Sequence, residues 1–281
     1  MTTVAALLEE GAAALSPAGI ERPRFEARVL LEAATGASRA GLLAHPDRTV
    51  AACDAERFRG WLARRARREP LAYVLGRVEF WSLDFSVGPG VLVPRADSET
   101  LIQAVLAAFH DRSRPLRILD LGVGSGCLLL TLLHHFDLAS GIGIDRSTAA
   151  LAYAQRNAEA LGVVARVELR VGDWIEDVDA RFDVVVANPP YIPRGEIDTL
   201  QAEVSRHEPR GALDGGGDGL DAYRVILPAL PALLGPGGAA FLEIGRGQEQ
   251  ALLPLATAIV GACRLHHDLA GVDRCLEIRP R

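Results

Sequence analysis

Apolar side chains recur at helical spacing through the first 76 residues of the chain. Val4, Leu7, Leu8 and Leu15 fall at helical spacing in a segment that Thr2 or Thr3 can cap. A second segment opens at Pro23, which suits the first turn of a helix, and a glycine ends it at position 36. A third runs from about residue 51 to residue 68 with apolar residues on one face. Residues 1–76 are therefore predicted to form a helical N-terminal domain.

The pattern changes after residue 76. Between residues 79 and 92 apolar and polar side chains alternate, which is the period of a half-buried strand. The segment also contains Gly88, Pro89 and Gly90, and glycine and proline clusters favour turns. We interpret residues 77–93 as a β-hairpin linker between two domains.

From residue 94 to residue 281, short apolar runs alternate with amphipathic segments. Alternation of this kind predicts a mainly parallel sheet with helices on both faces, an α/β fold of the Rossmann-like type. A helix is expected at 127–135, another at 148–161, a third at 218–234 and a fourth at 248–260. The seven expected strands are 118–121, 141–145, 167–171, 182–187, 240–244, 264–269 and 274–278.

Composition narrows the class of protein. The chain has 281 residues, 49% of them hydrophobic, and a formal net charge of −6, and all 30 basic residues are arginine. A mildly acidic chain is a poor candidate for non-specific nucleic-acid binding. The four cysteines have no metal-ligand spacing, so we expect no metal and a reducing compartment. With no basic and apolar leader at the N-terminus and no membrane span, we expect a cytoplasmic protein.

Six arginines crowd the third predicted helix, between residues 57 and 68. A solvated helix face is the favoured interpretation of such a cluster. The alternative is a docking surface for an acidic partner, either a protein or RNA.

A glycine-rich loop follows the first strand of the predicted sheet. Glycines suit a tight turn that must approach a ligand closely, and the helix that follows offers free N–H groups. Asp145 ends the next strand, where a carboxylate can accept both hydroxyls of a ribose. Asp173 and Trp174 follow the third strand and can meet an adenine ring. Together these features favour S-adenosylmethionine, and the glycine spacing argues against a nicotinamide cofactor. The loop residues are Gly122, Val123, Gly124, Ser125 and Gly126.

The fourth strand runs into Asn188, Pro189, Pro190 and Tyr191, the most informative stretch of the chain. Consecutive prolines make a rigid turn and leave its carbonyl groups free as acceptors. With the side-chain carbonyl of Asn188, such acceptors can hold both hydrogens of a planar NH₂ group, and Tyr191 can pack against that group. We therefore assign these four residues to catalysis and substrate binding, and Asn188 also to the cofactor site. Orientation would supply the catalysis, since no general base can be named.

The chain resembles the HemK family over essentially its whole length. That family methylates N5 of the glutamine in the Gly-Gly-Gln motif of class 1 peptide-chain release factors. The resemblance implies the same reaction, a seven-stranded S-adenosylmethionine-dependent methyltransferase domain at 94–281, the site residues named above and a product, S-adenosylhomocysteine. Val123, Ala96 and Ser98 depart from the usual family residues and affect only fine pocket geometry. Beyond Asn-Pro-Pro-Tyr, the resemblance is carried by residues 69–76, 79–81, 93–99, 206–209, 212–216, 218–220, 223–224, 242–245 and 268–274.

Two other functions share part of this evidence. Adenine N6-methylation of DNA or RNA uses the same Asn-Pro-Pro-Tyr chemistry, but the acidic catalytic domain and the lack of a basic target-recognition segment disfavour it. A cofactor-binding protein without turnover is disfavoured by the intact motif. We expect a monomer that acts on a release factor, without a direct nucleic-acid substrate, and we assign substrate docking to residues 1–76.

Overall fold

The computed structural model describes residues 2–176 and 178–280, which divide into two compact units. The first takes in the chain up to Arg77 together with Gln201–His207, and the second takes in Val78–Leu200 and the chain from Glu208 onward. A short segment that follows the Asn-Pro-Pro-Tyr motif therefore belongs to the N-terminal unit, which the sequence does not indicate.

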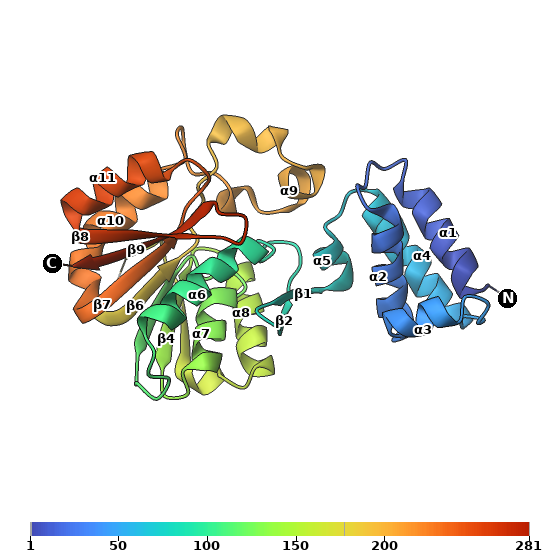
Figure 1. The fold of residues 1–281 in the computed structure, drawn as a ribbon, viewed down its shortest axis with the longest axis horizontal. Helices are drawn as coiled ribbons and strands as arrows, with labels where there is room; N and C mark the ends of the chain where they lie inside the picture. Colours follow the sequence, from blue (N-terminus) through green and yellow to red (C-terminus); the bar gives the residue numbers. More distant parts are fainter. Residues whose placement is uncertain (1, 177, 281) are drawn as a thin grey trace. The chain divides into compact units, whose positions relative to one another are not determined.

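The first unit is a helical bundle around its own apolar core, as predicted. The Thr3 hydroxyl caps the first helix by accepting a hydrogen bond from the Ala6 N–H at 3.3 Å, and Gly36 ends the second with a φ of 67°. Leu30, Leu31 and Phe58 are fully buried between the helices. Three short helices were not predicted, α3, α5 and α9. The helices are α1 (Val4–Leu15), α2 (Pro23–Thr35), α3 (Arg39–Ala44), α4 (Ala52–Ala66), α5 (Leu71–Leu75) and α9 (Ala202–His207) (Figure 1).

The arginines of α4 are mostly engaged inside this unit. Arg65 is only 4% exposed and donates to the carboxylates of Glu26 and Glu203. Arg68, just beyond the helix, also pairs with Glu203 of α9, and Arg64 pairs with Glu69. The favoured interpretation of a solvated face is therefore wrong for these arginines. Their partners come from distant segments, so only the folded chain brings the charges together.

The hairpin is shorter than its sequence pattern suggests. β1 (Arg77–Phe80) and β2 (Leu83–Ser86) form a two-stranded sheet. Trp81 and Ser82 connect them with positive φ angles of 53° and 60°, a conformation that suits a two-residue hairpin turn. The Gly-Pro-Gly cluster at 88–90 lies after the second strand and is not the turn. A turn at Trp81 and Ser82 could not be predicted, since hairpin turns with positive φ favour asparagine and glycine over these two residues.

The second unit contains the predicted seven-stranded sheet, in the order β5-β4-β3-β6-β7-β9-β8. The first five strands of this order run parallel, while β9 is antiparallel to both β7 and β8. The carboxyl ends of the parallel strands therefore meet at one edge of the sheet. The strands are β3 (Arg117–Leu121), β4 (Ser140–Asp145), β5 (Val167–Val171), β6 (Phe182–Ala187), β7 (Leu234–Glu243), β8 (Gly261–His267) and β9 (Asp273–Pro280).

Helices cover both faces of this sheet, each over its own apolar cluster (Figure 1). One cluster includes Leu101, Leu129 and Ala158, and the other includes Tyr223, Leu230 and Leu252. None of the described helices is long and apolar enough to cross a membrane. The first face is covered by α6 (Glu99–Ala108), α7 (Cys127–His135) and α8 (Thr148–Ala160), and the second by α10 (Asp221–Leu233) and α11 (Glu249–Ile259).

Candidate functional site

The glycine loop joins β3 to α7 at the carboxyl edge of the sheet. Gly122, Gly124 and Gly126 have φ angles of 76°, 56° and 84°, which side chains other than glycine rarely adopt. The N–H groups of Gly122 and Val123 both donate to the Ile144 carbonyl at 2.9 Å, so the loop is fixed to the neighbouring strand β4. The sequence thus forms a rigid turn whose outer surface carries little side-chain bulk.

Asp145, at the end of β4, also supports this loop. Its carboxylate accepts hydrogen bonds from the Gly124 N–H at 2.9 Å and from the Ser147 N–H at 2.8 Å. After β5, Trp174 adopts a φ of 52°, an uncommon angle for an aromatic residue, and its ring lies against Gly122. Asp145 and Trp174 therefore both lie against the glycine loop.

A cavity of about 570 Å³ lies along this edge, a volume typical of small-molecule sites. It extends from the glycine loop to the Asn-Pro-Pro-Tyr turn, so it joins the two predicted halves of the site. Gly126, Pro189 and Tyr191 are absent from its lining. Gly126 instead caps α7. The predicted residues that line the cavity are Gly122, Val123, Gly124, Ser125, Asp145, Asp173, Trp174, Asn188 and Pro190.

The Asn-Pro-Pro-Tyr turn follows the last residue of β6. The Asn188 amide NH₂ donates to the Ser98 hydroxyl at 3.2 Å, which leaves the Asn188 side-chain carbonyl available. Within the described chain, the carbonyl groups of Pro189 and Pro190 accept no hydrogen bond. Gly215 packs so closely that a Cβ there would lie 2.7 Å from the Pro190 oxygen. The Pro190 oxygen is therefore packed against Gly215, while the Asn188 side-chain carbonyl and the Pro189 carbonyl remain free acceptors on a tightly packed backbone.

Tyr191 supports the turn from within the protein. Its hydroxyl donates to the Glu243 carboxylate at 3.2 Å, and its carbonyl accepts from the Gln248 amide at 3.0 Å. Burial raises the pKa of Tyr191, and the neighbouring charge of Glu243 raises it further. Tyr191 therefore helps to hold the turn in place. This role goes beyond the packing against the substrate that the sequence predicts.

The segment before α6 supplies another wall of the site. Glu208, 6% exposed, accepts from the Arg95 guanidinium and from the Val93 N–H at 3.2 Å. Asp97 pairs with Arg274 of β9 at 2.9 Å, so its carboxylate does not cap the helix. These contacts tie the segment before α6, whose Leu92, Pro94 and Ser98 line the cavity, to distant parts of the chain.

Comparison with known proteins agrees with this geometry. The PrmC N-terminal domain model matches residues 6–76, and the Methyltransferase small domain model matches residues 95–218. The release factor glutamine methyltransferase of Moorella thermoacetica is 47% identical, over 97% of this chain and 97% of its own. That of Rhodospirillum rubrum is 44% identical, over 98% of this chain and 84% of its own. This chain belongs to the release factor glutamine methyltransferase family.

The fold of this family member extends to more distant proteins. The T. thermophilus 16S rRNA N2 G1207 methyltransferase, solved in complex with AdoMet and guanosine, superposes with a TM-score of 0.55 at 23% identity. The superposition covers 73% of this chain and 50% of that one. The predicted S-adenosylmethionine-dependent methyltransferase fold is thereby confirmed.

Sequence reasoning missed several residues that build the site of this release factor glutamine methyltransferase family member. Gln248 bonds Tyr191, Gly219 and Gly245 at once, and the Tyr223 hydroxyl donates to the Glu243 carbonyl at 2.6 Å. Tyr223 and Arg274 belong to stretches that carry the family resemblance, but the sequence assigns neither a role in the site. No local pattern marks these residues, because their partners lie between 3 and 177 residues away in the chain.

Proposed function

We propose that this protein transfers a methyl group from S-adenosylmethionine to the side-chain amide nitrogen, N5, of the glutamine in the Gly-Gly-Gln motif of class 1 peptide-chain release factors. The observation that carries the proposal is the single cavity that reaches both the glycine loop and Asn188. Family membership supports the identity of the acceptor, since the relatives are named as glutamine methyltransferases of release factors.

The residues present fit the cofactor. The left-handed glycines leave room for a ligand against the backbone, and the Asp145 carboxylate can exchange its N–H partners for ribose hydroxyls. Trp174 and Asp173 offer a ring and a carboxylate where an adenine would lie. When bound, S-adenosylmethionine supplies an electrophilic methyl group on a sulfonium sulfur.

The acceptor end of the cavity suits an amide. An amide nitrogen is a weak nucleophile because its lone pair is conjugated with the carbonyl group. The Asn188 side-chain carbonyl and a free carbonyl of the turn that follows it can hold both N–H groups and aim the nitrogen at the methyl group. Transfer forms an N–CH₃ bond, breaks the S–CH₃ bond and releases one amide hydrogen as a proton. S-adenosylhomocysteine is the second product.

A methyl-transfer assay with labelled S-adenosylmethionine tests the proposal. Purified release factor and duplex DNA are offered in parallel, and the labelled product is mapped. We expect label on the Gly-Gly-Gln glutamine and none in DNA. Label in DNA adenine would keep the cofactor and Asn188 assignments and overturn the protein substrate.

The N-terminal bundle is proposed to dock the release factor, because a Gly-Gly-Gln loop offers little surface for selective binding. Deleting residues 1–76 should weaken release-factor binding far more than S-adenosylmethionine binding. The deletion strips Glu203 of its partners Arg65 and Arg68, so the truncated chain should also carry Glu203→Gln. Full-length Glu203→Gln is the control. Equal loss of both affinities would contradict a docking role and indicate a folding role.

We further propose that the protein acts as a cytoplasmic monomer. Light scattering of the purified chain at assay concentration should give a mass near 30.0 kDa, and twice that mass would contradict the proposal.

A further inference from the structure

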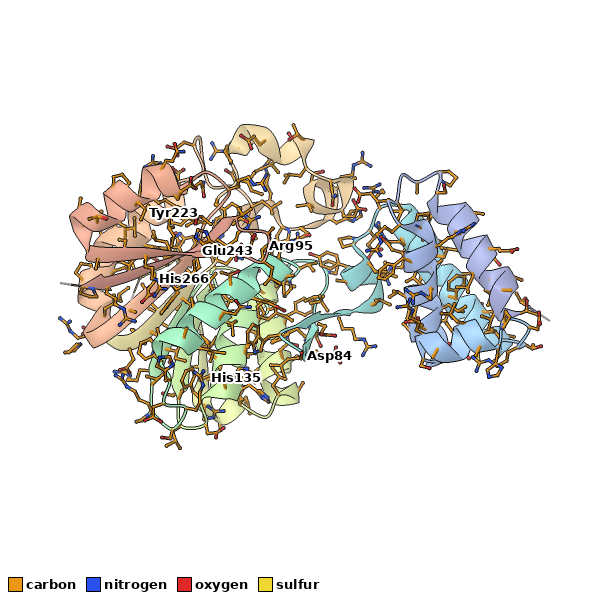
Figure 2. The ribbon with its side chains drawn as sticks, viewed as in Figure 1. Asp84, Arg95, His135, Tyr223, Glu243 and His266 are labelled. Carbon is orange, nitrogen blue, oxygen red and sulfur yellow. The ribbon has the colours of Figure 1, made fainter. Side chains whose placement is uncertain are left out.

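Glu243 ends β7 beside the Asn-Pro-Pro-Tyr turn and is 1% exposed. One carboxylate oxygen accepts from the Tyr191 hydroxyl, while the other has no hydrogen-bond partner among the described residues. The backbone of Glu243 is fixed separately, by the Tyr223 hydroxyl (Figure 2). A buried carboxylate with an unpartnered oxygen is unfavourable for folding, so its presence calls for another explanation.

The carboxyl group is connected to both ends of the motif. The Glu243 carboxylate contacts Tyr191, the last residue of the Asn-Pro-Pro-Tyr motif, directly. At the first residue the connection runs through Ser98, whose hydroxyl stabilises the ionised Glu243 and also accepts from the Asn188 amide. Ser98 is 2% exposed, so water does not compete for these contacts. Through Ser98, the Glu243 carboxyl group can therefore influence the orientation of the Asn188 side-chain carbonyl.

Opposing influences act on the ionisation of Glu243. Burial raises the pKa of its carboxyl to about 7, while the hydroxyls of Ser98 and Tyr191 and the charge of Arg274 lower it and Asp97 raises it. The group therefore titrates in the neutral range. The titratable and charged groups around it come from each element packed against it: Asp97, Tyr191, Tyr223 of α10, Cys127 of α7, and Arg274 and Cys275 of β9.

We propose that Glu243 is a positioning residue for methyl transfer, whose ionised carboxylate holds Tyr191 and Ser98, and through them the Asn188 carbonyl, in the orientation that binds the substrate amide. The inference rests on the proposed function. An ionised carboxylate accepts from the Tyr191 hydroxyl and is stabilised by the nearby Ser98 hydroxyl, whereas a protonated carboxyl carries a proton of its own that needs an acceptor. Turnover should therefore rise with pH as Glu243 ionises.

Glu243→Gln tests the role, because glutamine keeps the size of the side chain and cannot ionise. At pH 8 we expect kcat to fall about tenfold, as for a lost charge-assisted hydrogen bond, with S-adenosylmethionine affinity retained. The rise of kcat through neutral pH should disappear. Glu277→Gln is the matched control, since Glu277 is a buried glutamate of β9 that pairs with His266 and Arg279, and it should keep the wild-type profile.

Tyr191→Phe gives a second test if Glu243→Gln does not fold. Loss of the tyrosine hydroxyl removes a hydrogen bond that lowers the pKa of Glu243, so the rise in kcat should move to higher pH. A side chain with a merely structural role would lower activity and thermal stability together and leave that midpoint in place.

The outcomes separate the two proposals. A wild-type protein that methylates no release factor overturns the proposed function and the role of Glu243 with it. An active wild type whose Glu243→Gln variant keeps both kcat and the neutral-pH rise overturns the role of Glu243 alone. So does a variant whose activity falls only in proportion to its thermal stability.

Discussion

The two halves of the cavity are built by different means. On the cofactor side, at β3, β4 and β5, backbone geometry dominates, and the strand-end acid Asp145 has both oxygens bonded to N–H groups of its own neighbourhood. On the substrate side, at β6 and β7, side chains hold one another, and the strand-end acid Glu243 is buried with one oxygen unpartnered. The two acids occupy comparable strand positions and have opposite environments.

The difference shows what each half must do. A cofactor site has to be complementary to a ligand of fixed shape, and a rigid loop with an accessible carboxylate is enough. A substrate site must orient one amide for transfer, and orientation depends on how firmly the contacting groups are held. Predictions that affect one half and spare the other test this division.

The largest effect is expected for Asn188→Ala. It removes the side-chain acceptor of the amide hydrogens, so kcat should fall by about 10²–10³. S-adenosylmethionine affinity, measured by calorimetry, should change by no more than about tenfold because Asn188 is one lining residue among many. Wild-type turnover in this variant would contradict the assignment of the motif to catalysis.

A smaller effect, on the other half, is expected for Asp145→Ala. Loss of the carboxylate removes the acceptor proposed for the ribose hydroxyls, so S-adenosylmethionine should bind about 100-fold more weakly. kcat at saturating cofactor should change little. The matched control is Asp183→Ala, because Asp183 lies near the opposite end of β6 and accepts from Arg114 and the Arg117 N–H. Equal affinities in the two variants would contradict a ribose-binding role.

The cofactor half could be predicted from sequence because its determinants are local. Gly122, Gly124 and Asp145 lie in one continuous strand–loop–helix–strand stretch, where Gly124 and Asp145 bond across only 21 residues. The expected bounds of α7, β5 and β6 agree with the structure. Helix α10 begins at Asp221, three residues after its expected start, and β7 begins at Leu234, six residues before its own. Loops rich in glycine and proline carry no periodic signal that would fix those boundaries.

The substrate half could be predicted only in its motif. Asn188 stood out by its neighbours, but its contact with Ser98 spans 90 residues of sequence and that of Tyr191 with Glu243 spans 52. The arginines near α4 follow the same rule, since Arg65 meets Glu203 across 138 residues. Periodicity describes which face is buried and not which polar groups meet there.

The smallest effect is expected for Asp120, a second buried acid, which lies in the cofactor half. It tests whether burial of an acid is enough to make turnover depend on pH, or whether the acid must also lie in the substrate half. Burial raises the pKa of the Asp120 carboxyl to about 7. The hydrogen bond from the Leu129 N–H lowers this pKa, and the nearby charge of Asp145 raises it. Because the folded pKa exceeds the ordinary value of 3.8, the carboxyl stabilises the fold when protonated, and this contribution is lost as pH rises from about 4 to 7.

Asp120→Asn should remove that loss and raise the free energy of unfolding at pH 8 by on the order of 2 kcal/mol relative to the change at pH 5, measured by urea denaturation. The rise of kcat through neutral pH should persist in this variant, since the Asp120 carboxylate accepts its hydrogen bond from the Leu129 N–H of α7. Glu243→Gln should share the change in stability and lose the kinetic rise. If Asp120→Asn also abolished the rise of kcat, the ionisation of Glu243 would not be what controls turnover.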